Sequence, residues 1–152
     1  IAPLAELISD RESDILDSEF VGIPKLVLDD DKFSSSDTKI IIYASGRELR
    51  KAGFTSFDLV HFEMPDAAIE PLISRGDTLT VDRGQVDISS GNLYALIYKK
   101  RLSVRRLYLT NGLVVLHGDN QDDARWKFDV EVETEDIKII GRIISRTGSN
   151  GL

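Results

Sequence analysis

The chain has 152 residues, 41% of them hydrophobic, which suits one globular domain with a packed core and one or two peripheral segments. Its formal net charge of −7 argues against direct binding of a nucleic-acid backbone, which needs a clustered basic face. The absence of cysteine excludes disulfides and cysteine-based zinc sites. No apolar run approaches the roughly 20 residues that cross a bilayer, so we expect a cytoplasmic protein without a membrane partner.

The N-terminal residues predict a short helix. Residues 4–16 place leucine and isoleucine near helical spacing, although their middle is polar. The first residue is not methionine, so we expect a further segment upstream. We therefore interpret residues 1–19 as a linker or short helix and residues 20–152 as the domain proper.

The next segment mixes strand, loop and helix signals. The apolar residues that begin at Phe20 favour a strand, whereas the polar run from Asp29 to Lys39 predicts a mobile loop. Residues 39–43 are short and β-branched and predict another strand. Residues 45–53 predict a short helix that ends at Gly53 as its C-terminal cap.

From residue 57 onward the pattern is almost entirely that of strands. Asn111-Gly112 is a strong hairpin signal and predicts that residues 102–109 and 113–117 pair antiparallel. We expect a mostly β fold of antiparallel strands with one or two short helices. The predicted strands of this part are 59–64, 77–82, 92–100, 102–112, 113–119 and 137–148.

The order of several motifs is more specific than any one of them. The chain contains, in order, YASGRELRKAGF, AAIEPLISRGDTLTVD, SGNLYALIYKKRLSVRRLYL, LVVLHGDNQDD and IKIIGRII. From about Phe20 to Arg146 this order resembles the C-terminal domains of LexA-like and bacteriophage CI-type repressors, with the UmuD proteins as relatives. The resemblance implies the fold of those domains and a missing N-terminal helix-turn-helix domain that would contact operator DNA.

Members of that family cleave themselves with a serine–lysine dyad, in which a desolvated, neutral lysine takes the proton of the serine. The resemblance places Ala68 at the serine position and Arg105, 37 residues later, at the lysine position. Alanine has no nucleophilic atom, and the guanidinium of arginine stays protonated in proteins. We therefore predict a degenerate dyad without catalytic residues.

The bond that such domains cleave is usually Ala-Gly, on a loop some 35 residues before the serine. The resemblance places that region at residues 30–36, with Lys32, Phe33 and Ser34 at its centre, and it contains no Ala-Gly. Ala52-Gly53 lies only 16 positions before Ala68, where helix capping explains it better. The missing scissile bond agrees with loss of self-cleavage.

Other residues that could carry chemistry have simpler interpretations. We interpret His61 and His117 as surface or packed histidines, because no partners for catalysis or metal binding are identified. No motif places a lysine beside the alternative serine nucleophiles, which are Ser34, Ser35, Ser36, Ser74 and Ser103.

The acidic runs at 29–31 and 119–123 favour solvated loops, with divalent cation binding as the alternative. Trp126 and Phe128 are expected to cover a sheet face, with an exposed partner contact as the alternative. We predict neither a cofactor nor a metal.

The resemblance favours the oligomerisation and regulatory domain of a phage or prophage repressor in the cytoplasm of its bacterial host. A homodimer or higher homo-oligomer would make the second operator contact intramolecular. A repressor that RecA cannot induce to cleave itself would need another release signal, and we favour an antirepressor protein. By resemblance, the closing strand supplies the contact residues Ile137, Ile139, Ile140, Arg142 and Ile143.

Two alternatives remain open. One is a self-cleaving peptidase domain of a RecA-responsive repressor, inactivated by a serine-to-alanine change at position 68. The other is a UmuD-like polymerase accessory subunit.

Overall fold

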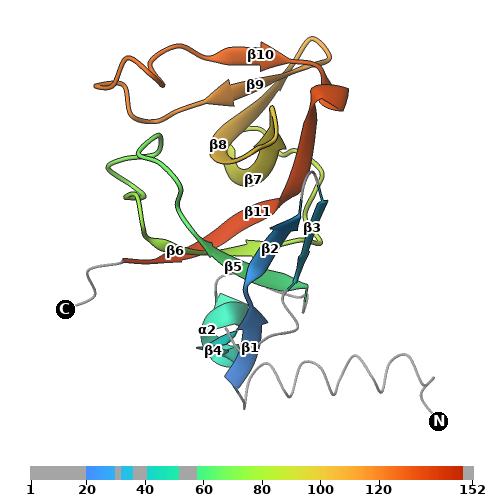
Figure 1. Cartoon of the computed structure of the whole chain (residues 1–152), viewed down its shortest axis with the longest axis vertical. Coiled ribbons are helices and arrows are strands. Elements are labelled where there is room, and N and C mark those ends of the chain that lie inside the picture. The colour runs from blue at the N-terminus through green and yellow to red at the C-terminus, as the bar shows by residue number, and fades with distance from the viewer. Residues whose placement is uncertain (1–19, 30–31, 36–40, 52–57, 149–152) are drawn as a thin grey trace.

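The computed structural model describes residues 20–29, 32–35, 41–51 and 58–148 (Figure 1). The helix predicted at 4–16 and the cap predicted at Gly53 lie outside these ranges. Strand accounts for 52% of the structure and helix for 7%, which confirms the mostly β class. None of the helices in the described ranges is long and apolar enough to span a membrane.

One antiparallel sheet of seven strands forms the body of the molecule. Its spatial order is β10-β9-β8-β7-β11-β6-β5, so the last strand of the chain lies inside the sheet. The strands are β5 (Leu59–Glu63), β6 (Thr78–Asp82), β7 (Asn92–Tyr98), β8 (Arg101–Thr110), β9 (Leu113–His117), β10 (Val130–Val132) and β11 (Ile137–Thr147).

Strand β11 joins two parts of this sheet. Its first half pairs with β7 and its second half with β6, with shifts of register between Ile139 and Gly141 and between Ile143 and Ser145. In Figure 1, β11 runs from the β8–β10 region to β6. A Cβ atom at Gly141 would collide with the backbone carbonyl of Asp82. Glycine at this bulge therefore lets β11 approach β6 closely.

Two small sheets lie beside β5. Strand β1 (Phe20–Pro24) pairs with β4 (Ile41–Ser45), which leads into helix α2 (Gly46–Lys51). Strand β2 (Leu26–Asp29) pairs with β3 (Lys32–Ser35). In sequence, both small sheets come before β5, the first strand of the seven-stranded sheet.

The prediction of a mobile loop from Asp29 to Lys39 is wrong for Asp29 and for residues 32–35, which form part of the β2–β3 hairpin. Residues 30–31 and 36–39 lie outside the described ranges. The prediction relied on polar composition, but backbone pairing with an adjacent strand forms a ladder whatever the polarity of the side chains.

The core lies on both faces of β7. Ala95 and Ile97 belong to one buried cluster, whereas Tyr94 and Leu96 belong to another. Side chains alternate between the faces of a strand, so this burial pattern identifies β7 as a strand covered on both sides. The first cluster also contains Ala68, which links the core to the candidate site.

Two hairpin turns connect β7, β8 and β9. Asn111 and Gly112 both have positive φ, 52° and 78°, and the β8–β9 pairing confirms the predicted hairpin. Lys99 and Lys100 also have positive φ, 49° and 64°, and form the turn between β7 and β8. Placing both lysines in a strand was wrong, because this turn lacks the asparagine or glycine that usually marks one. Strand β10 and the 3₁₀ helix η1 (Thr134–Asp136) were also missed.

Replacing Gly141 with alanine should destabilise the fold much more than replacing Gly112. At Gly112 a Cβ atom would meet nothing within 4 Å, so Gly112→Ala costs only left-handed backbone strain, about 1–2 kcal/mol. Gly141→Ala adds the collision with the Asp82 backbone. Urea denaturation followed by far-UV circular dichroism measures both losses, and equal losses would contradict the close approach of β11 to β6.

Candidate functional site

Ala68 lies in the loop of residues 64–77 between β5 and β6, which we call the Ala68 loop. The base of this loop is closed where Met64 N–H donates to the Asp77 carbonyl at 2.8 Å and Gly76 N–H donates to the Met64 carbonyl at 2.9 Å. Within it, Ala68 N–H donates to Asp66 Oδ1 at 3.0 Å. A short aspartate that accepts a backbone N–H two residues later fixes a turn locally.

The loop between β9 and β10, residues 118–129, covers Ala68. The Asn120 backbone N–H donates to the Ala68 carbonyl at 2.9 Å, and Asn120 Nδ2 donates to the Ala67 carbonyl at 2.9 Å. A Cβ atom at Gly118 would lie 2.7 Å from Trp126 Cβ and 3.3 Å from the Ala68 oxygen. Glycine is therefore needed there, and Ala68 is fully buried beneath the loop.

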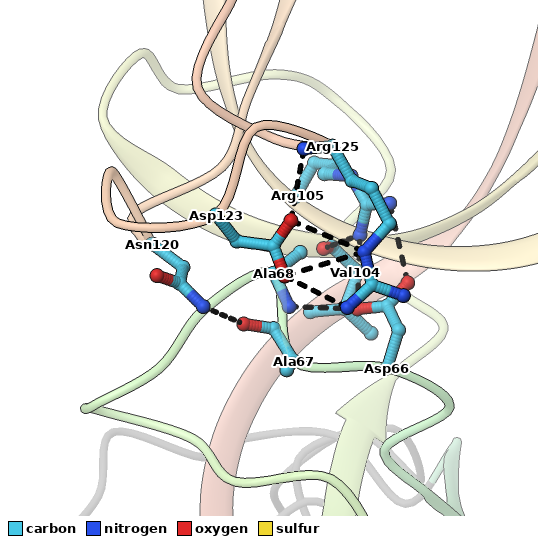
Figure 2. Close-up of polar contacts among 8 residues, drawn as sticks. All are labelled: Asp66, Ala67, Ala68, Val104, Arg105, Asn120, Asp123 and Arg125. Carbon is cyan, nitrogen blue, oxygen red and sulfur yellow. Dashed lines mark hydrogen bonds and ion pairs between the residues drawn. The ribbon is translucent and has the colours of Figure 1, made fainter.

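Arg105 reaches the same place from β8. Its Nη1 donates to the Val104 carbonyl at 2.7 Å and to Asp66 Oδ1 at 3.4 Å, and its Nη2 donates to Asp66 Oδ2 at 3.2 Å. Asp66 Oδ1 thus accepts hydrogen bonds from both Ala68 and Arg105 (Figure 2). The structure brings the two positions of the predicted degenerate dyad together through one carboxylate.

This arrangement lacks the groups for nucleophilic catalysis at the two dyad positions. Ala68 offers no nucleophile, and the Arg105 guanidinium cannot act as a base. Ser103 lines the same pocket as Arg105 and Asp66, but neither lysine nor histidine lines that pocket. Asp66, its only carboxylate, already forms an ion pair with Arg105. None of the residues that line this pocket therefore offers Ser103 a free base.

Sequence reasoning missed Asp66 and Asn120, which fix the Ala68 loop. Asp66 precedes Ala68 by two residues, the spacing of a turn stabilised by an aspartate side chain. Asn120 lies within the segment LVVLHGDNQDD that contributed to the resemblance, but the sequence assigned it no role. Neither hydrogen bond of Asn120 to the Ala68 loop follows from local sequence, because 52 or 53 residues separate the partners.

The two histidines contact residues of other segments of the fold. His61 is buried, and its Nδ1 lies 2.9 Å from the Ile23 carbonyl, which holds β1 against β5. His117 Nδ1 lies 2.7 Å from Asp129 Oδ1, and its Nε2 lies 3.6 Å from Asp119 Oδ1. Both histidines thus join separate segments of the fold, as packed residues do.

The acidic run at 119–123 supplies ion-pair partners to two arginines. Arg106 Nη2 donates to Asp119 Oδ2 at 2.7 Å, and this hydrogen bond raises the pKa of Arg106 above its ordinary value. Arg125 Nη2 donates to Asp123 Oδ2, also at 2.7 Å. Within the described ranges, no group of three or more His, Cys, Asp or Glu side chains could hold a metal ion.

Trp126 and Phe128 have different surroundings. Trp126 is half-buried and packs against the core cluster that contains Ala68. The Arg125 guanidinium lies over its ring, 4.3 Å from the centroid. Phe128 is 76% exposed, so the expectation that it covers a sheet face is wrong. The loop directs its side chain to the surface, which its apolar character alone did not indicate.

The predicted cleavage-loop residues Lys32, Phe33 and Ser34 lie in β3, in a sheet separate from the one that carries Arg105.

The predicted oligomerisation residues differ in exposure. Ile140 is fully buried in the core of its own chain, so its side chain cannot contact a partner. Ile137, Ile139 and Ile143 are half-buried, and Arg142 Nη2 donates to Asn92 Oδ1 at 3.0 Å. The role of these four residues stays a prediction.

Comparison with known proteins agrees with the resemblance drawn from the motifs. A family model described as Peptidase S24-like matches residues 48–144, a range that includes the Ala68 loop, Arg105 and Asn120. No curated protein matches the chain.

Asn120→Ala should loosen the cover over Ala68. It removes one of two donors to the part-buried Ala67 carbonyl, which still accepts from the Glu70 N–H, and the loss of one intramolecular hydrogen bond costs about 0.5–1.5 kcal/mol. Asp122→Ala, a change in an exposed neighbour, should cost less than about 0.5 kcal/mol. Chemical denaturation of both variants gives the free energies of unfolding, and an unchanged value for Asn120→Ala would contradict the role of this clamp.

Proposed function

Because the chain belongs to the Peptidase S24-like family, the family of LexA-, CI- and UmuD-type C-terminal domains, we propose that it is a domain of a phage or prophage repressor. It would regulate the repressor through association between repressor chains. In this proposal it holds repressor chains together and does not cleave itself. An N-terminal helix-turn-helix domain would supply the contact with operator DNA, because the net charge of −7 does not suit binding of an extended DNA backbone by this domain.

The hydrogen bonding of Asp66 is the observation that carries the proposal. A family dyad needs a free hydroxyl and a neutral amine at positions 68 and 105, whereas this chain has a methyl group and a guanidinium there. Asp66 binds the Ala68 backbone and the Arg105 side chain together. The contacts of Asp66 thus hold positions 68 and 105 together, and neither residue can take a proton from a nucleophile.

The half-buried isoleucines of β11 support association. Ile137, Ile139 and Ile143 retain apolar surface although β11 lies inside the sheet between β7 and β6. Contact through β11 would use these side chains, which lie in a strand whose first half pairs with β7 and whose second half pairs with β6. Linking two DNA-binding domains in this way raises their effective concentration at paired half-sites.

Release from the operator then needs an input other than self-cleavage. We propose an antirepressor protein that binds this domain and shifts the association equilibrium. Phe128 supports this idea, because an aromatic side chain that is 76% exposed is a typical anchor for a protein partner. The acidic residues of the same loop could add charge complementarity to such a contact.

Restoring only the serine should not restore cleavage. Ala68→Ser leaves no base nearby, and in Ala68→Ser with Arg105→Lys the lysine would pair with Asp66, which favours its charged form. We expect intact chains for both variants after incubation at alkaline pH, measured as whole-chain mass by mass spectrometry. Adding Asp66→Asn removes the partner that keeps the lysine charged and tests whether that ion pair blocks the chemistry.

The rival function is an active serine peptidase whose nucleophile was replaced, and membership of a serine peptidase family favours it. Prompt self-cleavage of the Ala68→Ser chain, with Arg105 unchanged, would establish this rival and refute the proposal. A helix-turn-helix domain upstream would distinguish a repressor from a UmuD-like accessory subunit.

We expect the chain to form dimers or higher oligomers at micromolar concentration. Light scattering coupled to size-exclusion chromatography should give at least twice the 17.0 kDa of one chain. Ile139→Asp should lower the measured mass, whereas Lys138→Gln, at an exposed neighbour on the same strand, makes the charge more negative by the same one unit and serves as the matched control. A strict monomer would contradict the proposed association.

A further inference from the structure

A pocket with a basic lining lies beside Ala68. It has a volume of about 440 Å³ and is bounded by the Ala68 loop, the start of β8 and the 118–129 loop. Four arginines line it, namely Arg75, Arg101, Arg105 and Arg125, with Asp66 as the only acidic residue of the lining. This concentration of positive charge contrasts with the net charge of −7 of the whole chain.

Two of the four arginines are already neutralised. Arg105 forms its ion pair with Asp66 at 3.2 Å, and Arg125 forms one with Asp123 at 2.7 Å. Arg75 and Arg101 are exposed and have no acidic partner among the described residues. The pocket therefore keeps an excess of two positive charges after its internal ion pairs are counted.

The paired arginines are also held in place. The hydrogen bond to Asp123 raises the pKa of Arg125, and the negative charge of Asp66 adds a smaller effect in the same direction. The charge of Asp66 thus acts on Arg125 as well as on Arg105, with which Asp66 forms hydrogen bonds (Figure 2). Stacking of Arg125 on Trp126 fixes it further. These contacts restrain two donors before any ligand arrives.

The lining of β8 adds polar donors in a regular pattern. Arg101, Ser103 and Arg105 alternate along the strand, so they lie on one face of it. The hydroxyl of Ser103 can donate one hydrogen bond, and the guanidinium of Arg101 can donate two in parallel. The remaining walls include Leu102 and Trp126, which are apolar.

We propose that this pocket binds a small ligand through a phosphate monoester or inorganic phosphate group. Such a group carries about −1.5 to −2 charges at neutral pH and three strong acceptor oxygens, which match the excess of two positive charges and the donors of β8. The volume of about 440 Å³ falls within the range of small-molecule sites, about 300–1,000 Å³. It leaves space for an organic group against Pro65 and Trp126.

Calorimetric titration of the full chain at constant ionic strength tests this assignment. The probes are phenyl phosphate, inorganic phosphate and benzoate, each up to about 10 mM. We expect saturable binding of phenyl phosphate and weaker binding of benzoate. Tighter binding of phenyl phosphate than of inorganic phosphate identifies an organic ester as the ligand, and equal binding identifies phosphate itself. Absence of saturable phosphate binding, or equal binding of benzoate, overturns the proposal.

Substitutions separate the pocket from general charge effects. Arg101→Gln and Arg75→Gln should each weaken phosphate binding about tenfold, because each removes a charged hydrogen-bond donor. Lys127→Gln removes the same charge from an exposed residue that follows Trp126 but does not line the pocket, and should leave the affinity unchanged. The melting temperature without ligand checks that every variant folds. An equal loss in Lys127→Gln would assign the binding to general electrostatics and overturn the proposal.

Discussion

The structure depends on the pairing of β11 with two strands that do not pair with each other. Strand β11 hydrogen-bonds to β7 through its first half and to β6 through its second half. Without it, β5 and β6 would have no neighbour in the sheet that carries β7 to β10. The missing side chain at Gly141 permits this contact, and Ile140 beside it fills the core. One glycine and its neighbour therefore join the two parts of the domain.

The candidate site lies across that junction. The Ala68 loop leaves β5 and returns to β6, whereas Arg105 and Asn120 belong to strand β8 and to the loop that follows β9. Asp66 and Asn120 connect the two parts by side-chain hydrogen bonds, so the site adds to the cohesion that β11 supplies. The contacts around Ala68 and Arg105 therefore stabilise the fold even in the absence of catalysis.

Elements that are marked by neighbouring residues could be predicted from the sequence, whereas contacts between residues far apart in the chain could not. Alternating apolar residues identified most strands of the large sheet, and Asn111-Gly112 identified a hairpin, because both signals arise from neighbours along the chain. The turn at Lys99 and Lys100 was missed since lysine rarely adopts positive φ, and the strand pairing of residues 32–35 was missed because their composition is polar. Motif order placed Ala68 and Arg105, but their link through Asp66 required the fold.

Trp126 gives this chain an internal optical reporter. It is the only tryptophan, and it lies between the Arg125 guanidinium and the core cluster that contains Ala68. Gly118 packs against it, so opening of the 118–129 loop exposes the indole to water. Selective excitation of tryptophan fluorescence therefore reports on one region, where the 118–129 loop packs on the core and lines the arginine pocket. A red shift of its emission without loss of secondary structure identifies local opening of that wall.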